Sequence, residues 1–536
     1  MKNNTLKIFS KTSNLQRNDK NIIFFQDYVE DISLSKVREF SEGIFRENKE
    51  FLRSYIHNGY EITWAWYGDI FSISQKYMKY EKIILHIERV KYDQIIFKDV
   101  PNDLIKLIRM AFPEISIINL DLKKAHEIRI FLLNFVGLIY SLFSLVVSFF
   151  KRNNRVASYT GDFIFKNSRC DIRLIELYKL YDRNNINFIE FIRMTSGKNF
   201  IVNIFKRRRM AIYVSSFQYF INLFFKNTHY KKRPKNFQES LLYSYHGSNL
   251  ALQKEILVFE KIFKFLGVKK FFGISFSSRS ASLFFAAKTI GAPIIGIMHG
   301  LQQRDYAVYE FIEPFNNKNL IGCDYYGTWS LHYKNYFKEY SKIHSNIIYS
   351  GPLRSVSSFQ KKFNFSQQDD EKIKVLVISE PHASFSDLVP FIKALIESKE
   401  ICLGIKLRPM IKDNFLEILE NFGLDISSIE IVDDELLKAG KSYDIFIGSY
   451  STAIIEACLI SKLSLLIYTN KWGDYFDLNS SPLGPMLLTN DPGEFINIIK
   501  LRIENENKLK SIIFFRERFF GNFNKNGAEW IVNLIS

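Results

Sequence analysis

The sequence predicts an α/β protein built from two doubly wound domains, in which helices cover both faces of parallel sheets. The chain has 536 residues, 47% of them hydrophobic, whereas single cores rarely grow beyond about 250–300 residues. Short apolar runs alternate with helical patterns in both halves of the chain, and this alternation is typical of parallel sheets. The clearest strand–helix–strand run covers residues 270–298.

Residues 1–125 show this alternation but carry no motif with recognisable chemistry. Apolar runs predict strands at 21–25, 82–86, 94–97 and 115–120, with helices between them. We interpret this segment as an α/β unit with a parallel sheet.

Residues 126–235 are hydrophobic and basic, and they predict a helical insertion in the N-terminal half. Residues 130–150 are 21 uncharged residues in succession. This length suits a membrane-spanning helix, but we favour a buried or interfacial helix. Basic clusters at 206–209 and 231–235 bracket an aromatic stretch. They indicate a membrane-surface patch, with nucleic-acid binding or a plain solvated face as alternatives.

Residues 236–353 hold the first candidate site residues. A strand at 270–275 runs into a serine-rich turn at 277–280, and a strand at 292–298 ends at His299. Ligands of open parallel sheets bind beyond the carboxyl ends of the strands, so both places are candidate ligand sites. Ser278, Arg279 and Arg304 are candidate ligands of an anionic acceptor, and the alternative for the two arginines is a surface charge.

A polar segment at 356–372 is interpreted as a linker, after which the alternation restarts at residue 373. Residues 443–456 (YDIFIGSYSTAIIE) predict a buried strand, a turn of small hydroxyl residues and a helix start. Unpaired N–H groups and the helix dipole at such a turn favour phosphate, although ordinary capping by Ser or Thr is the alternative. The last residues, from Pro492, are helical by period and can pack back across the domain junction.

Several segments between about 240 and 535 together resemble GT-B glycosyltransferases. They are GAPIIGIMHG, DYYGTWS, IIYSGPLRS, GIKLRP and DIFIGSYSTAIIEA. Their order is similar to that in bacterial surface-polysaccharide transferases of the capsule and polysialic-acid type, and in CDP-glycerol glycerophosphotransferases. The resemblance implies a GT-B-like fold: two Rossmann-like domains that face a cleft. Residues 1–355 would form the acceptor domain, with the insertion at about 126–235, and residues 373–536 the nucleotide-donor domain.

The resemblance also implies roles for residues of the second domain. Ser449, Ser451 and Thr452 are expected to hold the donor phosphates, and Glu456 to bind a ribose hydroxyl or order the turn. Ser379 and Lys406 belong to the same expected donor site. These families commonly have Lys-x-His-Pro where this chain has Lys406-Leu-Arg408-Pro. Arg408 can clamp phosphate, but it cannot donate a proton near neutral pH.

His299 matches the His-Gly pair of the glycerophosphotransferase-like enzymes, where it resembles a catalytic base. Inverting sugar transfer needs a base for the acceptor hydroxyl, and histidine suits that task. Asp305 and Glu310 are the runner-up bases. The alternative for His299 is a structural histidine that bonds to backbone.

These observations predict a metal-independent, inverting glycosyltransferase that moves a sugar from a nucleotide-activated donor to a bacterial surface glycan, such as a capsule or an O-antigen. The sequence shows no convincing metal motif, and the nucleotide-sugar is a substrate rather than a cofactor. The formal net charge of +17 favours anionic partners. Four widely spaced cysteines and the lack of an apolar leader predict a cytoplasmic protein, peripheral at the inner membrane.

Two other functions stay open at this point. The first is a CDP-polyol phosphotransferase of the same fold. The second is a non-catalytic protein of surface-carbohydrate assembly, for which the arginine at position 408 is the best support. No nucleic-acid partner is expected, because no recognition motif accompanies the basic clusters.

Overall fold

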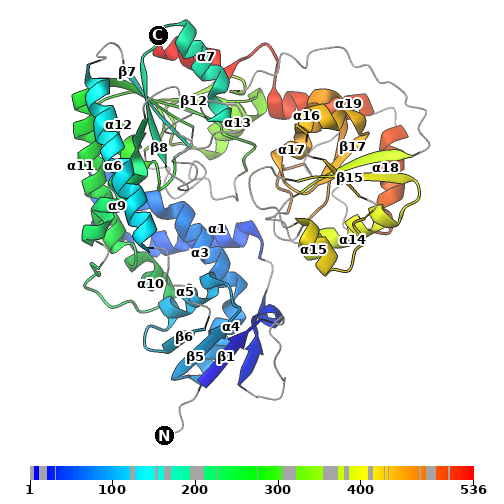
Figure 1. Cartoon of the computed structure of the whole chain (residues 1–536), viewed down its shortest axis with the longest axis horizontal. Coiled ribbons are helices and arrows are strands. Elements are labelled where there is room, and N and C mark those ends of the chain that lie inside the picture. Colours follow the sequence, from blue (N-terminus) through cyan, green and yellow to red (C-terminus); the bar gives the residue numbers. More distant parts are fainter. Residues whose placement is uncertain are drawn as a thin grey trace.

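The computed structural model contains three α/β units and confirms the predicted fold class, with two of the units doubly wound and Rossmann-like in a GT-B-like pair (Figure 1). It describes residues 5–10, 21–29, 32–120, 127–150, 155–161, 171–193, 211–225, 227–274, 276–303, 305, 321–353, 372–379, 385–407, 415–427, 429–432, 434–469, 473–478, 491–504 and 508–536. The domain boundaries stay a prediction, and most of the predicted linker lies outside the described residues.

The N-terminal unit is a four-stranded parallel sheet with the order β2-β1-β5-β6. Its strands are β1 (Thr5–Phe9), β2 (Ile22–Phe24), β5 (Gln94–Lys98) and β6 (Ser116–Asn119). Its helices are α1 (Leu34–Glu47), α2 (Lys49–Arg53), α3 (Tyr67–Lys79), α4 (Glu81–Val90) and α5 (Asn102–Ala111), and a small hairpin joins β3 (Ile56–His57) to β4 (Tyr60–Glu61). The strand predicted at 82–86 is wrong, because this run lies in α4. Its buried residues Ile83, Ile84 and Ile87 share one helix face.

The first Rossmann-like unit has a seven-stranded parallel sheet with the order β13-β12-β11-β10-β7-β8-β9. Its strands are β7 (Arg155–Gly161), β8 (Phe188–Arg193), β9 (Ala211–Tyr213), β10 (Val268–Gly273), β11 (Ile294–Ile297), β12 (Tyr325–Thr328) and β13 (Asn346–Tyr349). Its helices are α6 (Glu127–Phe149), α7 (Ile175–Arg183), α9 (Val214–Phe225), α10 (Phe237–Tyr243), α11 (His246–Leu266), α12 (Ala281–Thr289) and α13 (Leu331–Tyr340).

The prediction of a helical insertion at 126–235 is therefore wrong. This segment supplies β7, β8 and β9, which are the three strands at one side of the seven-stranded sheet. The apolar residues that suggested an insertion are strand residues buried under helices, such as Phe191 and Ile212, neither of which is exposed. The apolar helix at 130–150 is also not a buried one, since most of α6 faces outward.

The second Rossmann-like unit is a five-stranded parallel sheet with the order β16-β15-β14-β17-β18. Its strands are β14 (Ile373–Ile378), β15 (Ile401–Lys406), β16 (Glu430–Val432), β17 (Ile445–Gly448) and β18 (Leu463–Leu466). Its helices are α14 (Phe385–Glu397), α15 (Phe415–Asn421), α16 (Leu436–Ala439), α17 (Thr452–Ile455), α18 (Phe495–Glu504) and α19 (Lys508–Phe515), which continues as a π-helical turn at Arg516–Phe520.

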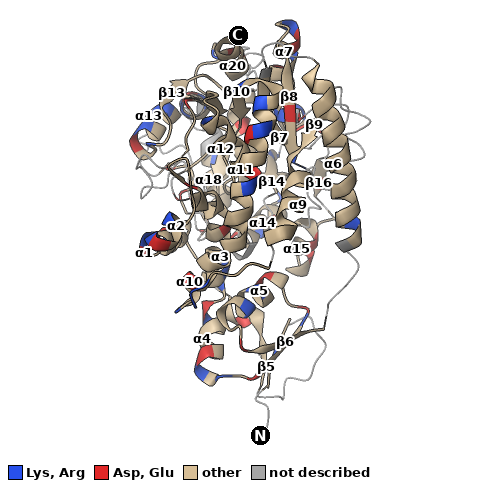
Figure 2. Ribbon diagram, turned by 90° about the vertical axis from the view of Figure 1, so that its left-hand side faces the viewer, with Lys and Arg blue, Asp and Glu red and all other residues tan. Residues whose placement is uncertain are grey.

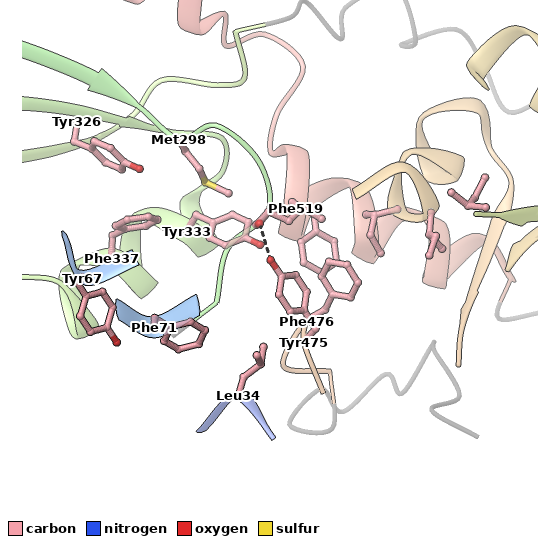
Figure 3. Packing of buried hydrophobic residues seen from close by; sticks show 14 of the residues in the cluster. Leu34, Tyr67, Phe71, Met298, Tyr326, Tyr333, Phe337, Tyr475, Phe476 and Phe519 are labelled. Carbon is pink, nitrogen blue, oxygen red and sulfur yellow. Dashed lines mark hydrogen bonds between the residues drawn. The ribbon is translucent and has the colours of Figure 1, made fainter. Parts of the chain in front are cut away.

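Aromatic packing joins the two Rossmann-like units. Tyr333 of α13 lies 6.3 Å from Phe519, measured between ring centroids, and Phe519 in turn lies 5.7 Å from Phe476. Beside them, the Tyr475 hydroxyl donates a hydrogen bond of 3.3 Å to the carbonyl oxygen of Leu301 (Figure 3). One hydrophobic core therefore runs from the first unit into the second.

The chain then returns to the first unit through α20 (Gly527–Ile535), as expected for the helical C-terminal residues. Ile531 and Ile535 of α20 join the core that contains Leu177 of α7. The Lys270 ammonium on β10 donates hydrogen bonds of 2.8 and 2.9 Å to the carbonyl oxygens of Leu534 and Ile535. This contact fits the preference for a cation at a helix C-terminus.

Candidate functional site

Each Rossmann-like sheet has one place where the strand order reverses. In the first unit the chain runs outward from β7 to β9 and then returns to β10 on the other side of β7. In the second unit the same reversal separates β14 from β17. Helices that start from two such neighbouring strands lie on opposite faces, which opens a crevice at the carboxyl ends and makes it the usual ligand site.

Two predicted donor-site residues, Ser379 and Ser449, follow the two strands at the reversal in the second unit, and Lys406 ends the strand next to β14. Ser379 follows β14, Lys406 ends β15, and Ser449 follows β17. The backbone N–H of Ser379 donates a 3.0 Å hydrogen bond to the carbonyl oxygen of Lys406. Ser449 is 5% exposed, and its hydroxyl has no hydrogen-bond partner within the described part of the chain. A buried hydroxyl without a partner costs free energy, so this atom is suited to receive a ligand.

The hydroxyl turn begins a short helix, as predicted. Ser451 is the N-cap of α17, and its side chain accepts a 3.3 Å hydrogen bond from the backbone N–H of Ala453. Gly448 lets the strand approach this helix closely, because a Cβ there would lie 2.4 Å from Cδ1 of Ile454. After one α-helical turn the segment continues as a 3₁₀ helix from Glu456. The capping bond shows that Ser451 has a structural role, whatever ligand it also contacts.

A charged cluster lies at the carboxyl ends of β7 and β11 in the first unit. Asp171 has no exposed surface, and its carboxylate accepts bonds of 2.9 and 2.5 Å from Nε and Nη2 of Arg173. The remaining nitrogen, Nη1 of Arg173, lies 2.7 Å from Nε2 of His299. Backbone N–H groups of Gly161 and Arg173 also donate to Asp171. Asp171 therefore fixes the guanidinium and directs Nη1 toward the imidazole.

Desolvation and the neighbouring cation both favour the neutral form of His299. Desolvation, with the nearby Arg173 guanidinium as a smaller cause, lowers the pKa of His299 below its usual value, although His299 is exposed at the surface. Because arginine can only donate, Nε2 accepts and the proton of the neutral ring is on Nδ1. In this state Nε2 is not available as a base, so proton abstraction there requires Arg173 to move or to bind another acceptor.

The described ones among the other predicted residues of the first unit contact residues other than His299. Asp305 forms a 3.3 Å ion pair with Arg38 of α1. Ser278 and Arg279 lie in the turn before α12, where the carbonyl oxygen of Arg279 accepts a 3.3 Å hydrogen bond from Gln218. Three other predicted site residues lie outside the described residues: Arg304, Glu310 and Arg408.

The two strand-end loops face each other across the junction. A Cβ built on Gly300 would lie 3.8 Å from Oγ1 of Thr452, and Leu301 accepts the hydrogen bond from Tyr475. The His299–Gly300 loop of the first unit and the hydroxyl turn of the second therefore lie close together.

Asp171 and Arg173 were not predicted as site residues. The signal that could have found them is the alternating segment RVASYTG at 155–161. Recognised as the first strand of a doubly wound sheet, it would have placed the following loop at the reversal point.

No family model matches the sequence, and no curated protein matches it. Solved structures resemble it over 71% of the chain, at TM-scores of 0.42–0.44. S. aureus MnaA with UDP has 11% identity and a TM-score of 0.44, with 96% of its chain covered. A glycosyltransferase from Rickettsia africae ESF-5 has 14% identity and a TM-score of 0.42, with 97% of its chain covered. Acinetobacter baumannii MurG has 10% identity and a TM-score of 0.42, with 99% of its chain covered. Similarity this low carries no argument on substrate or on site residues.

Proposed function

We propose that this chain is a metal-independent glycosyltransferase that moves a sugar from a nucleotide-activated donor to a bacterial surface glycan. The observation that carries the proposal is the meeting of two strand-end loops at the unit junction, where Gly300 lies beside Thr452. The first of these loops carries His299, which Arg173 contacts from the loop after β7, and the other carries a turn of small hydroxyl residues. Sugar transfer needs such a pair of loops, since one must hold the donor and the other the acceptor.

The charges of the site suit a leaving nucleotide. Sugar transfer develops negative charge on the departing phosphate, and preorganised donors stabilise it most effectively. The backbone N–H groups of the hydroxyl turn, the unpartnered Ser449 hydroxyl and the Nη1 group of Arg173 are such donors. Ser449, Ser451 and Thr452 keep their proposed role as phosphate ligands.

His299 is the proposed base, with a condition set by the geometry. Nε and Nη2 of Arg173 are bound to Asp171, so Nη1 is the group that can turn to a donor phosphate. When a phosphate oxygen takes that N–H bond, Nε2 of His299 loses its donor and can accept the proton of an acceptor hydroxyl. The proposed mechanism thus makes base activity follow donor binding.

The first experiment is a thermal-shift panel of the purified chain with CMP, CDP, UDP, GDP and their sugar conjugates. A ligand that binds the native state raises the melting temperature, and at a hundred times its Kd it stabilises by about 2.7 kcal/mol. We expect one nucleotide family to stabilise the wild type and Ser449→Ala to lose that shift. Ser74→Ala is the matched control, because Ser74 is another buried serine whose hydroxyl has no partner among the described residues, on α3.

The donor conjugates separate the candidate activities. Turnover of a sugar nucleotide, abolished in His299→Ala, supports glycosyl transfer, whereas turnover of CDP-glycerol alone identifies a polyol phosphotransferase. If no nucleotide shifts the melting temperature and no donor is consumed, the proposal fails and a non-catalytic assembly protein replaces it.

A further inference from the structure

Helix α6 is long and apolar, yet it lies on the outside of the molecule. Its segment Ile128–Phe149 has a mean hydropathy of 2.3, and 22% of it is buried in the protein. By length and composition this segment could cross a membrane. Figure 2 shows α6 along the margin of the molecule, with the tan colour of uncharged residues over nearly its whole length.

Among the described residues, three of the four buried ones on the side of α6 that packs on the protein are small. Gly137, Ser141, Ser144 and Leu145 follow one another at helical spacing, and all four are buried. The Ser141 hydroxyl donates a 2.6 Å bond to the carbonyl oxygen of Gly137 and accepts a 2.9 Å bond from the backbone N–H of Tyr213. Tyr213 belongs to β9, the edge strand of the sheet. The helix is thus tied to the sheet edge and protects it.

The side of α6 that faces outward is large and apolar. Its stripe repeats at spacings of three and four residues, and each side chain is 48–57% exposed. The stripe consists of Leu132, Val136, Ile139, Leu142, Phe143 and Val146. A helix on the surface of a water-soluble protein has the opposite arrangement, with apolar residues inside and polar residues outside. The pattern of α6 is that of a helix whose outer face meets an apolar medium.

The apolar surface continues onto α9, and exposed basic residues follow α9 in the chain. Phe131 near the start of α6 packs on Phe220 of α9, with ring centroids 5.8 Å apart. Phe224 near the end of α9 is 82% exposed. The segment that follows carries exposed Lys231 and Arg233. Apolar side chains beside lysine and arginine are the combination that binds anionic lipid surfaces.

We propose that α6 lies in the plane of an anionic lipid bilayer, with its outward stripe inserted among the acyl chains and its inner side still bound to β9. The Ser141–Tyr213 bond argues against a spanning helix, because withdrawal from β9 would leave a buried N–H without a partner. A second copy of the chain would also bury the stripe, since homodimer interfaces are apolar, but it gives no role to the exposed lysine and arginine that follow α9. This inference stands apart from the proposed function.

The test is sedimentation of the purified full chain with two kinds of vesicle: phosphatidylcholine alone, and phosphatidylcholine with one-third phosphatidylglycerol. We expect strong binding to the mixed vesicles that weakens in high salt. The variant Ile139→Ser/Phe143→Ser/Val146→Ser should bind at least about tenfold more weakly, because three apolar side chains leave the acyl region. Its melting temperature should match that of the wild type, since the substitutions face outward.

A matched triple variant controls for a general loss of surface hydrophobicity. It replaces three exposed apolar residues away from α6 and α9, namely Ile56, Leu331 and Leu501, with serine, and we expect it to bind vesicles like the wild type. Equal loss in both triple variants would overturn the proposal. The proposal would also fail if the wild-type chain bound no vesicles and instead formed a dimer that the triple variant of α6 does not form. In cell membranes, resistance to alkaline carbonate extraction would overturn the in-plane arrangement.

Discussion

The Arg173→Gln variant is expected to lose about 2–3 kcal/mol of unfolding free energy near neutral pH. The reason is Asp171, whose carboxylate has no exposed surface and accepts two bonds from the Arg173 guanidinium. Without that cation, two backbone N–H groups and a shorter amide would have to satisfy a buried negative charge. Breaking a buried pair by removing one partner costs about 3–5 kcal/mol. We lower this figure because 41% of the arginine side chain is exposed and solvent screens the pair.

A double-mutant cycle isolates this interaction from other effects of the substitution. The variants are Arg173→Gln, Asp171→Asn and the double variant, and urea unfolding followed by intrinsic fluorescence measures each stability. We expect the double variant to be more stable than Arg173→Gln, because a neutral amide at position 171 needs no cation. A coupling energy of about 2 kcal/mol would agree with the structure. If Arg173→Gln costs less than about 0.5 kcal/mol and the cycle shows no coupling, Asp171 does not hold Arg173 toward His299.

Three further predictions concern other parts of the same chain. His344 is 8% exposed, accepts a 3.0 Å bond from the Cys323 N–H and has its pKa lowered by burial to about 3. Below about pH 6.5 the unfolded state therefore takes up a proton that the native state does not, and about 2 kcal/mol of stability should be lost by about pH 5. Urea titrations near neutral pH and at about pH 5 measure this loss, and His344→Asn should remove it. Gly351→Ala should destabilise by at least about 2 kcal/mol, because φ is +82° and the new Cβ would lie 2.4 Å from the Lys525 carbonyl oxygen; a melting temperature equal to that of the wild type would contradict this packing. Ser451→Ala should cost about 1 kcal/mol through its lost cap even without nucleotide, and an unchanged melting curve would show that the cap contributes nothing.

The second Rossmann-like unit was predictable because its signals are local. The strand at 445–448 is buried along its whole length, and the hydroxyl residues that follow it cap the next helix. A buried strand, a cap and a helix each leave a mark within a few residues of sequence. Ser379, Lys406 and Ser449 were expected at the donor site from the resemblance to GT-B enzymes, and the structure has each of them at or directly after a strand end.

The first Rossmann-like unit was harder to predict because its strands β7 to β9 are short or lie near basic clusters. β9 has three residues, too few to show a period, and it follows directly after the cluster at 206–209. The contact between Arg173 and His299 joins residues 126 positions apart. It exists because β7 and β11 both flank β10, and that neighbourhood depends on the sheet order rather than on any local pattern. The exposure of α6 was hidden for a similar reason, since uniform hydrophobicity does not tell which side meets protein.

The return of α20 to the first unit has a consequence for synthesis. Ala528 and Ile531 share a core with Leu174 and Leu177, although the whole second unit separates these pairs along the chain. During translation, domains generally fold as they emerge from the ribosome, N-terminal first. Here the first unit must wait with part of its core exposed until residues 528–535 have emerged, by which time the second unit has been made. The unit that is synthesised earlier is therefore the one completed last, and while the second unit is being made the core around α7 still lacks the side chains of α20.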